Sequence, residues 1–246
     1  MAESRSDLIL HPPPNVMILG ATGTLGRALV SAFADAGWSA TAGWHKSQPP
    51  SDSGEILWSQ MDITDLTSLR RGITQHVTRW GRLDALVNAA GVAFEGLLPR
   101  QSATDWDQVL HLNLTGSLLC AQAALEVMEK QGHGHMILTG SHAGRTGAAG
   151  LTAYATAKAA LHGLTQDLAR EAGPFGIRVN AVLPGVLESA MTRNVSPKRR
   201  EEWIQANHLR QLNQPGEVAR FVVFLAGMRQ ASGQLFQLDS RPSSVF

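Results

Sequence analysis

The sequence predicts an α/β protein, a doubly wound parallel sheet in three αβα layers within a single domain. Short apolar runs alternate with helical stretches along the chain, which is typical of a parallel sheet with helices on both faces. With 246 residues and 43% hydrophobic content, the chain can bury one substantial core. The expected strands are 16–19, 39–43, 56–60, 85–88, 135–139, 178–183 and 234–238.

The stretch before the first strand differs in composition from the rest. Residues 1–14 are polar and then proline-rich, so we expect a flexible N-terminal arm ahead of a domain at 15–246. This stretch does not resemble a signal peptide, and no apolar run in the chain reaches the roughly 18–20 residues needed to cross a membrane. The sole cysteine, Cys120, can form no intrachain disulfide, which favours a reducing cytoplasm.

A glycine-rich turn directly follows the first strand. Asn15–Leu19 reads as a short buried strand, Gly20–Gly26 as the turn, and Arg27–Ala36 as a helix that Gly37 ends. Strand, glycine turn and helix form the first unit of a Rossmann-type fold, in which the backbone approaches a pyrophosphate at a helix N-terminus. The alternative is a purely structural turn. The candidate cofactor contacts here are Gly20, Thr22, Gly23, Thr24, Leu25 and Gly26.

The end of the second strand bears on the choice of cofactor. An acidic residue there would bind the adenosine ribose of NAD and repel a 2′-phosphate, but the strand leads into Trp44-His45-Lys46-Ser47. His45 and Lys46 are therefore candidates to hold the phosphate of NADP, and the pattern favours NADP(H) over NAD(H). The alternative is that both are solvated loop residues.

Tyr154 and Lys158 form a Tyr-x-x-x-Lys pair in a stretch of helix formers, 153–169. Residues four apart share a helix face, so both side chains are expected to border the same volume. A neighbouring ammonium favours the phenolate, so we expect it to lower the pKa of Tyr154 from near 10 and ease proton transfer. Ser141 follows an expected strand, and its hydroxyl is placed to bind a substrate oxygen. This layout favours a carbonyl reductase or alcohol dehydrogenase; the alternative is that Tyr154 packs and Lys158 is solvated.

With these motifs in place, the chain resembles a short-chain dehydrogenase/reductase of the one-domain type, from about Val16 to Asp239. Within that family it is most similar to the 3-oxoacyl-[acyl-carrier-protein] reductase group. Three departures from the family pattern are Gly23 in the glycine turn, Ala89 for a second asparagine, and Ser240-Arg241 for two glycines. The further residues matched to family motifs are Asp62, Ile63, Asn88, Ala89, Ala90, Gly91, Asn113, Pro184, Gly185, Val186 and Ser189.

The resemblance implies a role for each of these residues. Ser141 would hold the substrate oxygen, Tyr154 would donate a proton, and Lys158 would bind the nicotinamide ribose. Asn113 would connect that lysine to solvent through a water molecule. Of the other matches, Asp62 would contact the adenine, and the segments 88–91 and 184–189 would hold the rest of the cofactor.

The function expected from this resemblance is NADPH-dependent reduction of a ketone, with a 3-oxoacyl thioester as the first candidate substrate. A second reading is an NAD(P)-dependent dehydrogenase of a sugar, polyol or steroid alcohol. A third, of another class, is a non-catalytic dinucleotide sensor, although an intact Ser-Tyr-Lys set argues against it.

Charge and surface composition constrain the partners. A net charge of +1 excludes a global basic footprint for nucleic acid, and the nine histidines show no paired spacing for a metal. The cluster Lys198-Arg199-Arg200 is placed either to dock an acyl carrier protein or to begin a solvated helix paired with Glu201 and Glu202. The helices around 106–128 and 155–168 are apolar over more than one stripe, so we expect a homo-oligomer, a tetramer rather than a dimer.

Overall fold

The computed structural model describes residues 12–49, 56–189, 192–193 and 195–242. It contains one seven-stranded sheet in the order β3-β2-β1-β4-β5-β6-β7, in which every neighbouring pair is parallel. The doubly wound parallel sheet predicted from the sequence is therefore confirmed. The strands are β1 (Asn15–Leu19), β2 (Ser39–Trp44), β3 (Ile56–Gln60), β4 (Ala85–Asn88), β5 (Gly134–Thr139), β6 (Ile177–Leu183) and β7 (Leu235–Gln237).

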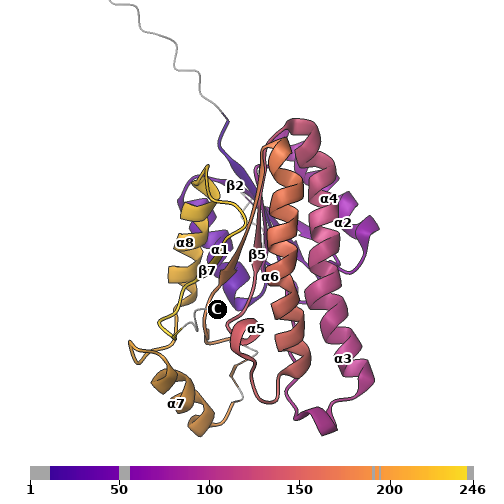
Figure 1. Ribbon diagram of the computed structural model, residues 1–246. Coiled ribbons are helices and arrows are strands. Elements are labelled where there is room, and N and C mark those ends of the chain that lie inside the picture. The colour runs from indigo at the N-terminus through magenta and orange to yellow at the C-terminus, as the bar shows by residue number, and fades with distance from the viewer. Residues whose placement is uncertain (1–11, 50–55, 190–191, 194, 243–246) are drawn as a thin grey trace, which may run out of the picture.

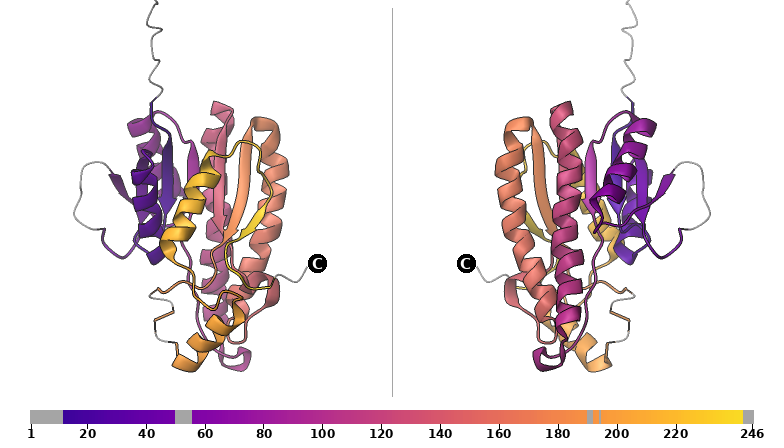
Figure 2. Two further views of the ribbon diagram at one scale, coloured as in Figure 1. Left: turned by 90° about the vertical axis from the view of Figure 1, so that its left-hand side faces the viewer. Right: turned by 90° about the vertical axis from the view of Figure 1, so that its right-hand side faces the viewer.

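Helices cover both faces of this sheet, as Figures 1 and 2 show. The main ones are α1 (Thr24–Asp35), α2 (Leu66–Trp80), α3 (Ala103–Leu110), α4 (Gly116–Gln131), α6 (Thr152–Ala172) and α8 (Pro215–Gly227). Two further helices, α5 (Ala143–Thr146) and α7 (Pro197–Ala206), lie toward the lower end of Figure 1. Within the described residues, no helix is both long and apolar enough to cross a membrane.

The two faces of the sheet have separate cores because strand side chains alternate in direction. On β1, Met17 and Leu19 pack in the core beneath α2, α4 and α6, whereas Val16 and Ile18 pack beneath α1 and α8. All four side chains are fully buried. This two-sided burial explains why the strand reads as a continuous apolar run.

The first helix differs slightly from the prediction. We expected it at Arg27–Ala36, but α1 begins at Thr24, because Gly23 has an extended backbone and serves as the N-cap. Gly26 therefore lies inside the helix. A Cβ atom there would come within 2.1 Å of the Gly20 carbonyl oxygen, so only glycine fits.

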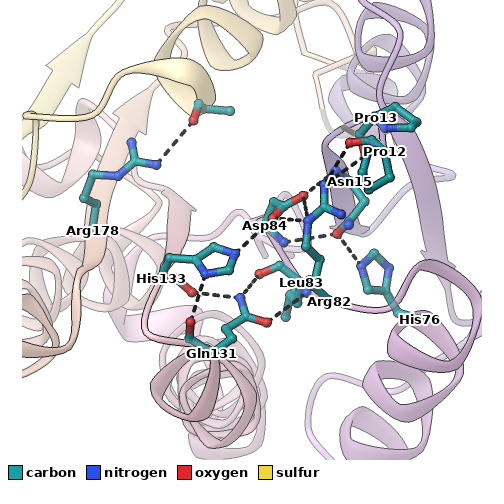
Figure 3. A network of polar contacts seen from close by, with 11 residues as sticks. Pro12, Pro13, Asn15, His76, Arg82, Leu83, Asp84, Gln131, His133 and Arg178 are labelled. Atoms are coloured by element: carbon teal, nitrogen blue, oxygen red, sulfur yellow. Dashed lines mark hydrogen bonds and ion pairs between the residues drawn. The ribbon is translucent and has the colours of Figure 1, made fainter. Parts of the chain in front are cut away.

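A polar network links four elements at the amino ends of the strands (Figure 3). His76 of α2 contacts Thr41 of β2 through Nδ1 at 2.7 Å and Asn15 of β1 through Nε2 at 2.8 Å. The amide N–H of Asn15 donates to Asp84 beside β4 at 2.9 Å. Arg82 pairs with Asp84 and donates to the carbonyl oxygens of Pro12 and Pro13. The network fixes the chain as it enters the sheet, while residues 1–11 of the expected arm lie outside the described residues.

Candidate active site

A cavity of about 390 Å³ connects the glycine turn, the Ser141 loop, α6 and α7. Its wall contains many of the residues singled out from the sequence. They are Gly23, Thr24, Leu25, Gly26, Ala89, Ala90, Gly91, Ser141, Tyr154, Lys158, Pro184, Gly185, Val186 and Ser189. These segments meet because parallel strands place their carboxyl ends, and the loops that follow, at the same edge of the sheet.

Ser141, Tyr154 and Lys158 border this cavity together. Ser141 lies in the loop after β5, and the other two lie one turn apart on α6. The Ser141 hydroxyl lowers the pKa of the Tyr154 phenol and also accepts from the Ala143 amide at 3.2 Å. Lys158 is 3% exposed, its Nζ donates to the Thr139 carbonyl oxygen at 2.7 Å, and it lies 5.6 Å from the centre of the Tyr154 ring.

The acidity of Tyr154 differs from our expectation. Burial raises the pKa of the phenol, and only the hydrogen bond from Ser141 opposes that rise. The expected lowering by Lys158 is therefore wrong for this structure. Lys158 is itself buried, which lowers its pKa to about 8 but leaves it mostly protonated at neutral pH.

Asn113 lies behind these residues, in a π-helical turn between α3 and α4 (η2, His111–Thr115). Such turns leave backbone carbonyl groups without their usual helical partners. The Asn113 amide, fully buried, donates to the carbonyl oxygens of Val109 at 2.9 Å and Val92 at 2.8 Å. A Cβ atom on Gly91 would lie 2.9 Å from Asn113 Oδ1 and 3.7 Å from Lys158 Nζ, so asparagine and lysine flank the same backbone.

The loop after β4 is shaped by Asn88 from behind the cavity. Its amide donates to the Ser117 hydroxyl at 3.0 Å, and its Oδ1 accepts the Ala90 amide at 3.1 Å. Gly20, with φ of +75°, meets this loop so closely that a Cβ atom would lie 2.7 Å from the Ala90 nitrogen. Asn88 and Gly20 therefore set the distance between the glycine turn and the 88–91 loop without lining the cavity.

The candidate adenosine-binding residues lie outside the cavity wall. His45 and Lys46 are exposed beyond β2, and His45 Nε2 lies 3.5 Å from Asp62 Oδ2. Burial raises the pKa of Asp62, but hydrogen bonds from Thr64 and the nearby histidines outweigh it and leave the pKa below its ordinary value. The Ile63 side chain packs in the core beneath α2 and α4, so only its backbone is available to a cofactor. The Thr22 carbonyl oxygen accepts from Arg27 at 3.0 Å.

The Pro184-Gly185 loop is held by Asn213, whose amide donates to the carbonyl oxygens of Pro184 at 2.9 Å and Leu238 at 2.7 Å. Ser189 follows, and its amide donates to Thr192 Oγ1 at 2.9 Å. Both Ser189 and Thr192 line the cavity.

Several residues of the wall were not assigned to the site from the sequence, although Arg199 had been singled out in the basic cluster and Arg241 as a departure from the family pattern. They are Ala93, Glu95, Thr139, Ala143, Ala148, Leu151, Leu187, Thr192, Arg199, Trp203 and Arg241. One signal was available, since Arg199 and Trp203 are four apart, and the guanidinium lies 5.8 Å from the centre of the indole ring. Within the basic cluster, Arg199 pairs with Glu202, but Arg200 pairs with Glu188 and not with Glu201.

The wall fits a nicotinamide dinucleotide. The tight glycine turn leaves the N-terminus of α1 open to a pyrophosphate. Thr139 Oγ1 is buried and has no hydrogen-bond partner among the described residues, and the Lys158 ammonium has donors beyond its bond to Thr139. Buried polar atoms of this kind need partners, which a bound ribose and carboxamide would supply.

Comparisons with known proteins agree with this site. The family model described as short chain dehydrogenase matches residues 14–200. The 3-oxoacyl-[acyl-carrier-protein] reductase FabG of Thermotoga maritima is 33% identical over 234 residues, 91% of this chain and 95% of that protein. The 3-oxoacyl-[acyl-carrier-protein] reductase of Synechocystis sp. is 33% identical over 235 residues, 91% and 94% of the two chains. The structure of levodione reductase matches with a TM-score of 0.86 at 27% identity, covering 92% of this chain and 96% of that one.

The chain belongs to the short-chain dehydrogenase family, which confirms the resemblance seen in its motifs. It is accordingly an NAD(P)-dependent oxidoreductase that acts on C=O or CH–OH groups.

Proposed function

We propose that this protein reduces a ketone to a secondary alcohol with NADPH, and that its substrate is a 3-oxoacyl thioester. The observation that carries the reduction is the meeting of Ser141, Tyr154 and Lys158 in the cavity that also contains the glycine turn. The thioester rests on the two 3-oxoacyl-[acyl-carrier-protein] reductases that match over 91% of the chain.

Each residue of the trio has a distinct part in this proposal. Bound NADPH supplies the hydride. The Ser141 hydroxyl donates a hydrogen bond to the substrate carbonyl oxygen, and Tyr154 donates its phenolic proton to that oxygen as the carbonyl carbon is reduced. The buried Lys158 ammonium holds the nicotinamide ribose. Asn113, which borders the Gly91 backbone near Lys158, supports the path by which Tyr154 regains a proton from solvent.

The preference for NADPH rests on the second strand. His45 and Lys46 are exposed where the adenosine ribose is expected, and the strand end has no carboxylate in its own sequence. His45 Nε2 lies 3.5 Å from Asp62 Oδ2, so its imidazole already faces a carboxylate, which makes Lys46 the stronger candidate for a 2′-phosphate.

The basic cluster at the start of α7 supports delivery of the substrate by an acidic carrier. Arg199 lines the cavity and stacks on Trp203, whereas Lys198 and Arg200 lie beside it without lining the wall. Lys198 and Arg200 are the residues that we assign to carrier docking. The buried Cys120 suits a reducing cytoplasm, because burial raises its pKa and keeps the thiol protonated.

The test of this function is NADPH oxidation with an acetoacetyl thioester, presented on an acyl carrier protein and on a short pantetheine arm. We expect turnover of both, and the Lys198→Ala/Arg200→Ala variant should lose kcat/KM for the carrier form in a salt-dependent way. The matched control removes two exposed arginines outside the cavity wall, Arg220 and Arg229. Absence of thioester turnover would overturn the substrate assignment.

A second candidate is reduction of a ketone without a carrier. Its support is the match to levodione reductase over 92% of this chain, a structure whose name indicates a different carbonyl substrate. Turnover of cyclic ketones with no thioester activity would favour this alternative. A non-catalytic sensor would turn over neither, which the intact Ser-Tyr-Lys set argues against.

A further inference from the structure

Arg241 reaches the cavity from the far end of the chain. It follows β7, in the stretch where the family resemblance leads us to expect two glycines and the chain has Ser240 and Arg241. Its side chain is only 15% exposed, yet it lines the same cavity as Ser141 and Tyr154. A guanidinium thus occupies wall space that glycine would leave empty.

Asp239 holds this arginine in a fixed position. Arg241 Nε donates to Asp239 Oδ2 at 2.6 Å, and its Nη2 pairs with the same oxygen. The other carboxylate oxygen of Asp239, which is 1% exposed, accepts from the side chain of Gln237 at 2.8 Å. A Cβ atom on Gly185 would lie 2.9 Å from Asp239 Oδ2, so the ion pair packs against the Pro184-Gly185 loop.

The guanidinium lies on the Ser141 side of the cavity. Burial lowers the pKa of His142, the next residue after Ser141, and the positive charge of Arg241 is the second cause. The His142 imidazole also contacts the carbonyl oxygen of Pro242, directly after Arg241, at 3.4 Å. Arg241 therefore lies close to the loop that carries Ser141, and both residues line the same cavity.

Arg241 retains unused hydrogen-bond donors. Asp239 takes Nε and one side of Nη2, and no described residue accepts a hydrogen bond from Nη1. The fork of a guanidinium matches a carboxylate, with two parallel N–H donors for two oxygens. The charged groups in the wall are Lys158, Arg199, Arg241 and Glu95, and two of these cations have carboxylate partners outside the wall, Glu202 for Arg199 and Asp239 for Arg241. A wholly neutral, apolar substrate would leave the free donors of Arg241, a side chain that is only 15% exposed, without a partner on the substrate.

We propose that Arg241 is a specificity-determining residue that binds a carboxylate on the carbonyl substrate, so that oxo acids are preferred over their neutral esters. This inference rests on the proposed carbonyl reduction but not on the thioester. A 3-oxoacyl thioester carries no free carboxylate, so the oxo acid is a different substrate class, and the test below decides for or against it. The inference also explains why arginine, and not the glycine of the family pattern, stands at position 241, because glycine offers no side-chain donor.

The test compares matched substrates: short 3-oxo and 4-oxo acids and their methyl esters, reduced with NADPH. For the wild type we expect kcat/KM to favour the carboxylates. The Asp239→Asn/Arg241→Gln variant removes both charges, so no buried carboxylate is left unpaired. Its preference should fall by roughly tenfold or more, the usual effect of losing a charge-assisted hydrogen bond. Activity on the esters should persist.

Two further variants separate recognition from folding. Arg241→Lys beside an intact Asp239 keeps the cation with fewer donors and should retain part of the preference. Arg220→Gln removes an exposed arginine of α8 that pairs with Glu217, and should leave the acid-to-ester ratio unchanged. Melting temperatures of all variants report whether each one folds.

Three outcomes would overturn the inference. One is an equal kcat/KM for acids and esters in the wild type. Another is an unchanged ratio in the double variant. The third is weaker NADPH binding in the double variant with an unchanged acid-to-ester ratio of kcat/KM, which would show that Arg241 binds the cofactor and not the substrate. If no ketone is reduced, the proposed function fails, and calorimetric titration of the NADP⁺ complex with the same acids and esters still decides whether a carboxylate binds through Arg241.

Discussion

At the scale of single residues, burial controls the chemistry of Tyr154 and Lys158. Burial raises the pKa of the phenol and lowers that of the ammonium to about 8. A phenol that stays protonated at neutral pH suits a proton donor, and reduction of a carbonyl consumes a proton. A protonated phenol is the form that the proposed carbonyl reduction requires of Tyr154.

Replacement of Tyr154 by phenylalanine should remove most turnover. The ring and its packing remain, and only the proton donor is lost, so kcat should fall by roughly 10²–10⁴-fold. Binding of NADPH, measured by fluorescence titration, should be preserved. A variant that kept more than about a tenth of the wild-type rate would show that another group is the acid.

Replacement of Lys46 by alanine should weaken NADPH binding and leave NADH binding unchanged. A charge-assisted contact to the 2′-phosphate contributes about 1.5–3 kcal/mol, or roughly tenfold or more in affinity. Titration of wild type and variant with both cofactors measures this difference. Equal or tighter binding of NADH by the wild type would contradict the preference for NADP(H).

At the scale of elements, two buried polar arrangements hold the helices against the sheet. The π-helical turn keeps Asn113 bonded to the Val92 and Val109 carbonyl oxygens. At the opposite end of the strands, His76 joins α2 to β1 through Asn15 (Figure 3), and to β2 through Thr41. Burial lowers the pKa of His76 to about 4, since imidazole in this position is stabilised in its neutral form.

This network makes stability depend on pH. Because the pKa of His76 falls from 6.5 to about 4, the unfolded chain binds more protons between those values. The free energy of unfolding is therefore highest above pH 6.5 and decreases as the pH falls toward 4, by at most about 3 kcal/mol from this residue. Burial of His135, whose pKa falls to about 3, acts in the same direction.

Urea denaturation between pH 4 and 7 measures this dependence. A His76→Gln variant should have a lower free energy of unfolding at pH 7, and that free energy should depend less steeply on pH. As a control, replacement of the exposed His208 should leave both the free energy of unfolding and its pH dependence unchanged. An identical slope in wild type and His76→Gln would show that acid sensitivity originates elsewhere.

At the scale of the whole molecule, α4 and α6 lie side by side on one side of the protein (Figures 1 and 2). Their outward positions include Leu118, which is 38% exposed, and the small exposed residues Ala159, Ala160 and Gly163. Exposed small and apolar residues of this kind suit the self-complementary contact of a twofold axis. The homotetramer expected from the sequence stays a prediction.

Light scattering at micromolar concentration should give four times the protomer mass. Changing Leu118 and Ala160 to glutamate places like charges across the expected twofold contact and should shift the mass toward smaller species. A protomer-sized mass for the wild type would contradict the prediction, as would an unchanged tetramer in the double variant.

Much of the fold could be predicted because its signals are local. Each strand is a short apolar run, and β1 through β6 begin within one residue of the predicted positions. The Tyr154–Lys158 pairing also follows from spacing alone, since residues four apart share a helix face. The start of α1 could not be placed, because an N-cap at Gly23 depends on backbone geometry that the glycine itself does not specify.

The sequence by itself determined the order of strands and helices, the glycine turn, and the Ser141, Tyr154 and Lys158 set. Only the tertiary structure decided which distant residues complete the cavity. Arg199 and Arg241 enter it because α7 lies over the carboxyl edge of the sheet and β7 pairs with β6. Tertiary burial also decided that the pKa of Tyr154 is raised and not lowered. Desolvation depends on every residue packed around the phenol, whereas the spacing in the sequence identified only one neighbour, Lys158.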